Sequence, residues 1–177
     1  LREIDGFAVS AGPGSFTGVR IGASTVKGLA FGTTIPCIGV STLKALAQNL
    51  IGFDGILCPV MNARRNQVYN ALFYVNQGVV TRQTPDRAIA LEDLKNVLKN
   101  LEKPIYLVGD GSLVAKAAQG DRVIAPAEHR MHQRAAGVAM VAAEMIAAGA
   151  ICDAESMQPN YLRLSQAERD KLERQSK

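Results

Sequence analysis

The sequence contains no tryptophan, and aromatic residues make up only 5% of its 177 residues. It has three cysteines and two histidines. Cys37, Cys58 and Cys152 are widely spaced, which favours reduced thiols of a cytoplasmic protein over a disulfide framework. No apolar run approaches the roughly 18 residues that a membrane span needs, and no signal peptide opens the chain. We therefore expect a cytoplasmic protein with no membrane partner.

The composition is that of a folded, mildly basic protein. Hydrophobic residues make up 47% of the chain, enough for a packed core. The length suits one domain or two small lobes. The net charge is +4 and the pI is about 9.1. This charge permits weak contact with nucleic acid but does not demand it, because much of it lies in residues 163–177.

The order of predicted strands and helices repeats once along the chain. Residues 6–50 predict strand, glycine turn, helix, strand and helix, and residues 104–148 predict the same order. Three strand-like segments and an amphipathic helix precede the second copy. One of those segments, 67–75, is joined to the next by Asn76-Gln77-Gly78, which predicts a hairpin turn. We therefore expect a duplicated α/β lobe with a mixed sheet and helices on its faces.

The repeat also predicts where the lobes begin and end. The chain opens at Leu1 and not at Met, and no strands precede the first copy, so we expect the first lobe to be incomplete at its N-terminus. The predicted division is residues 1–53 for the rest of the first lobe, 54–152 for the second lobe, and 153–177 for a C-terminal return segment and polar tail. The tail after residue 164 predicts a frayed helix or disorder.

Residues 11–22, AGPGSFTGVRIG, join the first strand to the first helix. The stretch lacks the lysine of a phosphate-binding loop, its glycines do not fit the dinucleotide fingerprint, and it misses the G-x-S-x-G pattern of a nucleophile turn. Two interpretations stay open. Gly12, Pro13 and Gly14 form a structural turn that needs glycine for its backbone angles, or the helix that follows binds an anion at its N-terminus.

The helix predicted over residues 17–31 has an unusually wide apolar surface. Small and apolar residues cover roughly twice the ~100° that a helix packed on one side needs. We therefore predict two neighbours, the helix's own sheet and a second element that accepts small residues. Either a partner protein or a helix upstream of Leu1 fills the second position. The predicted partner-binding residues are Gly18, Val19, Gly22, Ala23 and Val26.

Three stretches carry a family resemblance: GPGSFTGVRIG at 12–22, NARRNQVY at 62–69 and PNYLRL at 159–164. In this order and at these separations they resemble the TsaB (YeaZ) family, and the resemblance covers essentially the whole chain. It implies the actin-like, Hsp70-like ATPase fold, of ribonuclease H-like type, with two similar lobes. It also implies a role in making N6-threonylcarbamoyladenosine in tRNA.

The resemblance implies a scaffold and not a catalyst. The expected partner is a TsaD-like paralogue that carries the metal and transfers the threonylcarbamoyl group, and a TsaE-like ATPase joins them. A homodimer is a further expectation, and tRNA is contacted indirectly. We expect no cofactor and no catalytic residue in this chain, with ATP or ADP bound elsewhere in the complex.

Two enzymatic alternatives remain, a stand-alone nucleotide hydrolase and an M22 glycoprotease-like peptidase. His129 and His132 lack a His-Glu-x-x-His pattern, so we expect no metal site. Asn62 and Gln67 stand where the family commonly has acids, and neutral amides hold magnesium weakly. Asp110, between two glycines, belongs either to a degenerate nucleotide turn or to a simple strand-to-helix turn.

Two further groups of residues are candidates for contacts. Arg64 and Arg65 follow the first strand of the second lobe. They contact an anion, a partner or a tRNA phosphate, or they are exposed turn residues. Tyr161 and Leu162 are predicted to dock the end of the chain back across the lobes.

Overall fold

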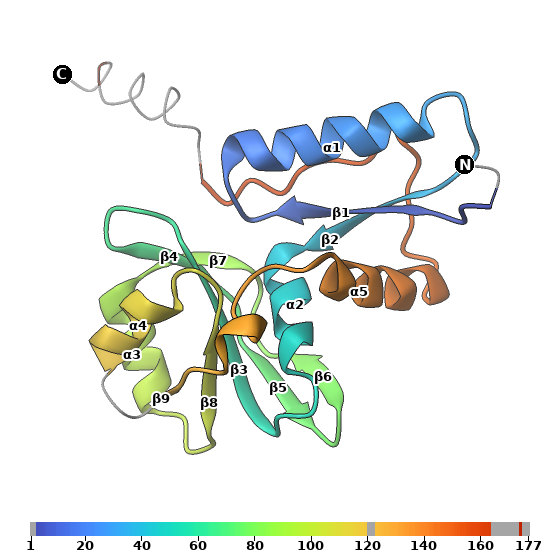
Figure 1. The fold of residues 1–177 in the computed structure, drawn as a ribbon. Coiled ribbons are helices and arrows are strands. Elements are labelled where there is room, and N and C mark those ends of the chain that lie inside the picture. The colour runs from blue at the N-terminus through green and yellow to red at the C-terminus, as the bar shows by residue number, and fades with distance from the viewer. Residues whose placement is uncertain (1–2, 120–122, 164–173, 175–177) are drawn as a thin grey trace.

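The computed structural model describes residues 3–119, 123–163 and 174 (Figure 1). The polar tail predicted after residue 164 lies outside the described residues apart from Arg174. The helices are α1 (Phe16–Ala30), α2 (Thr42–Ala47), η1 (Gln48–Leu50), α3 (Leu91–Lys99), α4 (Ser112–Gln119), η3 (Glu128–Arg130) and α5 (Ala135–Ala147). The strands are β1 (Phe7–Gly12), β2 (Cys37–Ser41), β3 (Gly55–Asn62), β4 (Gln67–Asn70), β5 (Phe73–Asn76), β6 (Val79–Arg82), β7 (Arg87–Ala90), β8 (Ile105–Val108) and β9 (Val123–Ile124).

The smaller of two packed units is built on the parallel pair β1 and β2 (Figure 1). Helix α1 connects the two strands and packs on β1, while α5 packs on the pair from the other side. Ser15 begins α1 because its hydroxyl accepts a hydrogen bond from the backbone N–H of Gly18. Val26 and Ala30, on the inner side of α1, form a core cluster with Phe7 of β1.

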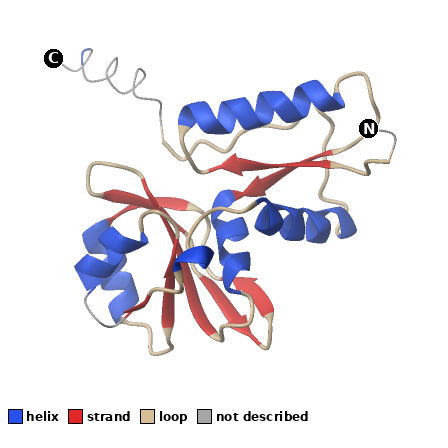
Figure 2. Cartoon of the chain, in the orientation of Figure 1, coloured by secondary structure: helices blue, strands red, loops and turns tan. Residues whose placement is uncertain are grey.

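The larger unit is a mixed sheet with helices on both faces (Figure 2). Strand β3 pairs antiparallel with β4 and β5 and parallel with β8, which in turn pairs parallel with β9. Side chains alternate along β3 as the pleat requires. Cys58 and Val60 contribute to the core with α3 and α4, whereas Leu57 and Met61 contribute to the core with α2.

The segment 67–75, predicted as one strand, is divided into β4 and β5. Both parts keep one register against β3, since Val60 faces Asn70 and Leu57 faces Phe73. The buried side-chain amide of Asn70 donates hydrogen bonds at this point to the backbone carbonyls of Pro59 in β3 and of Ala71 between β4 and β5. The predicted hairpin turn at 76–78 is confirmed, because Asn76 pairs with Val79 across a two-residue loop.

The closing helix of each half of the chain packs on the other half. Leu43 and Leu46 of α2 lie in one core cluster with Phe73 of the larger sheet. Val141 of α5 lies in one cluster with Ile38 of β2. The predicted division into 1–53 and 54–152 stays a prediction, and across it α5 packs on β2 of the first part while α2 packs on the sheet of the second. The sequence pattern gives the order of elements but not the sheet on which a helix packs.

Gly137 allows the backbones of α2 and α5 to approach closely where the two helices cross. A Cβ atom at Gly137 of α5 would overlap the backbone carbonyl oxygen of Ala45 in α2. Side chains reinforce the contact, since Lys44 pairs with Glu144 at 2.7 Å and the same carboxylate accepts a hydrogen bond from Gln48. None of the helices in the described part of the chain is long and apolar enough to cross a membrane.

The structure places the predicted partner-binding residues of α1 in different surroundings. Val19, Ala23 and Val26 are buried inside this chain, and a Cβ atom at Gly22 would lie 3.0 Å from Cγ2 of Val9. Ala23 and Val26 therefore pack toward β1 with Gly22 beside Val9, Val19 lines the cavity described below, and Gly18 alone of the predicted set is exposed. The outer face of α1 consists mainly of small or apolar residues: Gly18, Ile21, Ser24, Thr25, Gly28 and Leu29.

Replacing Gly22 by leucine should weaken folding. We expect Gly22→Leu to lower the free energy of unfolding by about 1–2 kcal/mol, because crowding against Val9 exceeds the gain in helix propensity. Gly28→Leu is the matched control, since nothing lies within 4 Å of a Cβ there, and it should stabilise by about 0.5–1 kcal/mol. Urea unfolding of both variants measures the difference, and equal midpoints would contradict the assigned orientation of α1.

Candidate functional site

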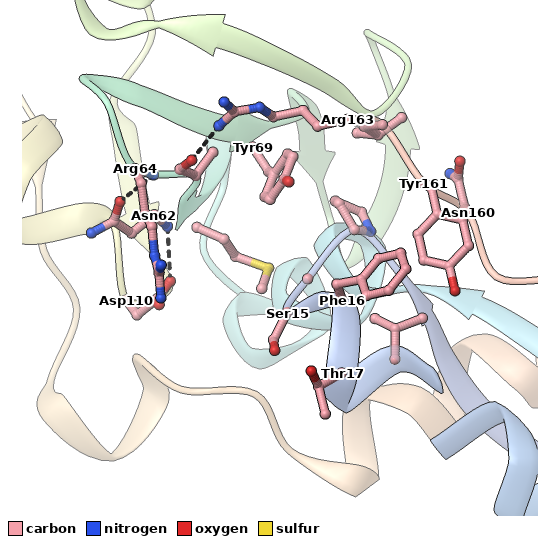
Figure 3. Close-up of a pocket in the computed structure, with 16 residues that line it drawn as sticks. Ser15, Phe16, Thr17, Asn62, Arg64, Tyr69, Asp110, Asn160, Tyr161 and Arg163 are labelled. Carbon is pink, nitrogen blue, oxygen red and sulfur yellow. Dashed lines mark hydrogen bonds between the residues drawn. The ribbon is translucent and has the colours of Figure 1, made fainter. Parts of the chain in front are cut away.

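A cavity of about 700 Å³ lies between the two units, where the carboxyl ends of β1, β3 and β8 approach one another (Figure 3). Ligands of α/β proteins commonly bind at this end of the strands. The cavity is lined by the turn and first residues of α1 (13–17 and Val19), by residues 61–64, by Tyr69 and Asp110, and by residues 160–163. The three sequence motifs, far apart along the chain, therefore meet at one place.

The first wall is the turn between β1 and α1. Gly12 has a φ of 117°, a backbone angle that favours glycine. A Cβ atom there would overlap the backbone carbonyl oxygen of Asn160, and the N–H of Asn160 donates to the carbonyl of Ala11 at 2.6 Å. The turn predicted at Gly12, Pro13 and Gly14 therefore also contacts the backbone at Asn160.

Residues 160–163, here called the return segment, close one side of the cavity. The ring of Tyr161 lies 5.0 Å from that of Phe16, and its hydroxyl accepts a hydrogen bond from Nε of Arg20. Arg163 then reaches the other unit, where its guanidinium donates to the carbonyl of Ala63. The return segment therefore contacts both units, through Tyr161 on α1 and through Arg163 on the turn after β3.

The opposite wall is the turn between β3 and β4. The carboxylate of Asp110 accepts a hydrogen bond from the backbone N–H of Asn62, and the side chain of Asn62 accepts one from the N–H of Arg64 (Figure 3). Arg64, Arg65 and Asn66 follow with φ values of 62°, 53° and 57°. Three consecutive left-handed residues other than glycine cost roughly 1–2 kcal/mol each, and such strain persists where the surroundings enforce it.

The two predicted anion-binding arginines lie in different surroundings. Arg64 lines the cavity, whereas Arg65 lines only a smaller pocket of about 320 Å³ behind the turn. Gln67 also lines the smaller pocket and not the cavity. Asp110 belongs to a strand-to-helix turn, since it lies between β8 and α4 and its carboxylate binds a backbone N–H.

The charges in the lining favour an anion over a divalent cation. Arg64 and Arg163 contribute positive charge, and the N-terminus of α1 adds the partial positive charge of its backbone. Asp110 is the one carboxylate among the lining residues, and it already accepts a backbone hydrogen bond. The cavity therefore supplies little negative charge for a metal ion.

The histidines lie outside the cavity. His129 belongs to η3 and His132 follows it, and neither lines the cavity. The backbone carbonyl of His132 accepts a hydrogen bond from the side chain of Asn49. Within residues 3–119 and 123–163, no three histidine, cysteine, aspartate or glutamate side chains are grouped so that they could hold a metal ion.

Comparison with known proteins gives the family. The family model of TsaD, described as tRNA N6-adenosine threonylcarbamoyltransferase, matches residues 1–171. The chain is 34% identical to the tRNA threonylcarbamoyladenosine biosynthesis protein TsaB of Bacillus subtilis (strain 168), over 98% of this chain and 76% of that protein. The chain belongs to the TsaB (YeaZ) family. The resemblance carried by the three motifs is thereby confirmed.

Further relatives agree with this assignment. TsaB of Escherichia coli (strain K12) is 30% identical over 92% of this chain and 72% of that protein. The structure of YeaZ from Pseudomonas aeruginosa superposes with a TM-score of 0.74 at 25% identity, covering 90% of this chain and 76% of that one. A shorter match, 44% identical over 61 residues, is to a tRNA N6-adenosine threonylcarbamoyltransferase of Cereibacter sphaeroides (strain KD131 / KCTC 12085).

Sequence reasoning missed several residues of the cavity. Tyr69, Asn160 and Arg163 line it although none was singled out as a site residue. All three lie inside the motifs that carry the family resemblance. The signal that could have found them was the motifs themselves, because residues of three distant motifs that meet in space commonly form one site.

The ring of Tyr161 should hold the return segment in place. We expect Tyr161→Ala to increase hydrogen exchange in residues 157–163 and to cost about 1–2 kcal/mol of unfolding free energy, because it removes the contact with Phe16. Tyr161→Phe keeps the ring and loses one exposed hydrogen bond, so it should change stability by less than about 0.5 kcal/mol. Mass-spectrometric hydrogen exchange distinguishes them, and identical protection in both variants would exclude the ring as the anchor.

Proposed function

We propose that this protein acts in tRNA threonylcarbamoyladenosine biosynthesis as a non-catalytic subunit that pairs with a TsaD-like paralogue. The names of its TsaB relatives support the pathway. The match to the transferase of Cereibacter sphaeroides supports a common origin with the catalytic paralogue. Work on tRNA would place the protein in the cytoplasm.

The observation that carries the scaffold role is the outer face of α1. Ile21 is 63% exposed and Leu29 is 43% exposed. Gly18 and Gly28, on the same face, have no side chains that would keep another helix at a distance. Large apolar side chains beside small residues on an exposed helix favour contact with a second protein. The TsaD-like paralogue is the proposed occupant. A second copy of this chain would compete for the same face and form the homodimer, and a TsaE-like ATPase joins the pair.

The cavity supports a non-catalytic role. Its one lining carboxylate, on Asp110, accepts a hydrogen bond from the backbone of Asn62 and so contributes to the structure of the turn. A stand-alone hydrolase or a peptidase would need a general base or a metal site. We therefore assign bound ATP or ADP to the partner subunits. Arg64 and Arg65, on their exposed turn, are proposed to contact an anionic group of the partner or of tRNA.

We infer that the two units are the lobes of an actin-like fold of ribonuclease H-like type. The order β1, α1, β2, α2 has the same arrangement as β8, α4, β9, α5, and both strand pairs are parallel. Each closing helix also packs on the opposite unit. This reciprocal arrangement supports a duplicated architecture.

Partner binding is tested on the outer face of α1. We expect Ile21→Asp to weaken association with the full-length TsaD-like paralogue at least tenfold, because a carboxylate would be buried in an apolar contact. Val79→Asp is the control, since Val79 is 67% exposed on β6 of the other unit. Co-purification and calorimetric titration measure binding, and circular dichroism checks folding. Wild-type affinity of a folded Ile21→Asp variant would exclude this surface.

The absence of chemistry in this chain is tested in a reconstituted tRNA modification reaction. Arg64→Ala, Asp110→Asn, His129→Ala and His132→Ala, made singly, should leave the rate of the chemical step within about tenfold of the wild type. Asp110→Asn keeps an oxygen that can accept the bond from Asn62. A loss of about a thousandfold in any variant with intact partner binding has the size of a lost catalytic group and would overturn the non-catalytic assignment.

A further inference from the structure

Cys37 and Cys152 lie directly opposite each other although they are 115 residues apart in the sequence. Cys37 at the start of β2 donates its N–H to the carbonyl of Cys152 at 2.7 Å and accepts the N–H of Cys152 at 3.1 Å. Residues paired in this way in an antiparallel bridge have Cα atoms about 5.5 Å apart. A disulfide spans about 4.4–6.8 Å between Cα atoms, so the backbone already has a suitable separation.

The two side chains also lie on the same side of the bridge, as directly opposed antiparallel residues do. The Cys152 thiol donates a hydrogen bond to the carbonyl of Cys37 at 3.3 Å, which places its sulfur over the partner residue. Cys37 is fully buried, whereas Cys152 is half-buried. The Cys152 thiol is therefore partly accessible to solvent, whereas the Cys37 thiol is not.

The chemical surroundings favour the protonated form of both thiols. Burial raises the pKa of the Cys37 thiol, and the neighbouring Cys152 thiol raises it further. Burial and the charge of Asp153 likewise raise the pKa of Cys152, while Lys27 opposes this effect. Both thiols are thus mainly protonated at neutral pH, and oxidation should be faster in alkaline buffer because the thiolate is the reacting form.

We propose that Cys37 and Cys152 form a reversible disulfide when the protein meets a small oxidised disulfide such as glutathione disulfide. The thiolate of Cys152 attacks one sulfur of glutathione disulfide and releases one glutathione thiolate, which takes up the proton. The thiolate of Cys37 then attacks the Cys152 sulfur of the mixed disulfide and releases the second glutathione. Two protein thiols are oxidised and one glutathione disulfide is reduced to two glutathione molecules.

The bond would fix the end of the chain to the smaller unit. Met157, after Cys152, packs in the same core cluster as Cys37, and Asn160 binds the carbonyl of Ala11. A covalent link at residue 152 would hold the following residues, including the return segment, on that unit. Closing a loop this long also restricts the unfolded chain, so the oxidised protein should melt at a higher temperature.

The experiment uses the full chain under native conditions. Reduced protein is incubated with glutathione disulfide at pH 8 and then unfolded in denaturant that contains N-ethylmaleimide, so that buried free thiols are also blocked, and peptides are mapped by mass spectrometry. We expect one linked peptide pair that contains Cys37 and Cys152, with Cys58 alkylated, and complete reversal by dithiothreitol. The melting temperature should rise by about 5–10 °C, and hydrogen exchange in residues 153–163 should slow.

Two variants control for chance oxidation. Cys58→Ser should behave as the wild type, because Cys58 is fully buried in the other unit and bonded to Asn70. Cys152→Ala should form no internal disulfide and show no rise in melting temperature. A wild-type protein that keeps Cys37 alkylatable, that stops at a glutathione adduct on Cys152, or that links Cys58 instead would overturn the proposal. These outcomes do not depend on the role in tRNA modification.

Discussion

The packing of α2 against α5 is the contact on which both units depend. Each helix covers the sheet of the opposite unit, and Gly137 allows the two backbones to meet. A second tie lies beside it, where the carboxylate of Asp86 accepts hydrogen bonds from Ser41 at the start of α2 and from Arg82 of β6. Because each sheet is covered by a helix from the other half, neither unit has a complete core of its own.

The cavity follows from this arrangement. With the two sheets fixed by the crossing helices, residues at or just after the ends of β1, β3 and β8, namely Pro13, Asn62 and Asp110, line a space that side chains do not fill. Several polar side chains in its lining form hydrogen bonds with the surrounding backbone, among them Asn62, Asp110 and Arg163. Asp110 and Asn62 organise the strained turn at Arg64. Residues that line the cavity therefore also stabilise the turns that form it.

Much of the fold could be predicted from the sequence, and the reasons are local. Alternation and glycine turns locate the strands, Ser15 and Ser41 each accept a bond from a helix N-terminus, and Gln77-Gly78 takes the positive φ values of a tight hairpin. The motifs locate the family and, through it, most of the cavity. These signals are carried by neighbouring residues, so no tertiary information is needed to interpret them.

The errors have a common physical origin in tertiary contacts. The apolar surface of α1 is wide enough to face in two directions, and the sequence alone does not say that Ala23 and Val26 face β1. The destination of α5 depends on a sheet that lies far away in sequence. The opposition of Cys37 and Cys152 likewise arises only when the chain returns to β2.

The contact between Gly12 and Asn160 has a consequence for the order in which the chain folds. The larger sheet draws its strands from residues 55–124 and is mostly assembled from sequence neighbours. The smaller unit must wait for α5 and for the N–H of Asn160 that binds Ala11. Non-local contacts of this kind form late, and chains emerge from the ribosome N-terminus first. Strand β1 is therefore synthesised before α5 and Asn160, and its native surroundings are complete only after both have emerged.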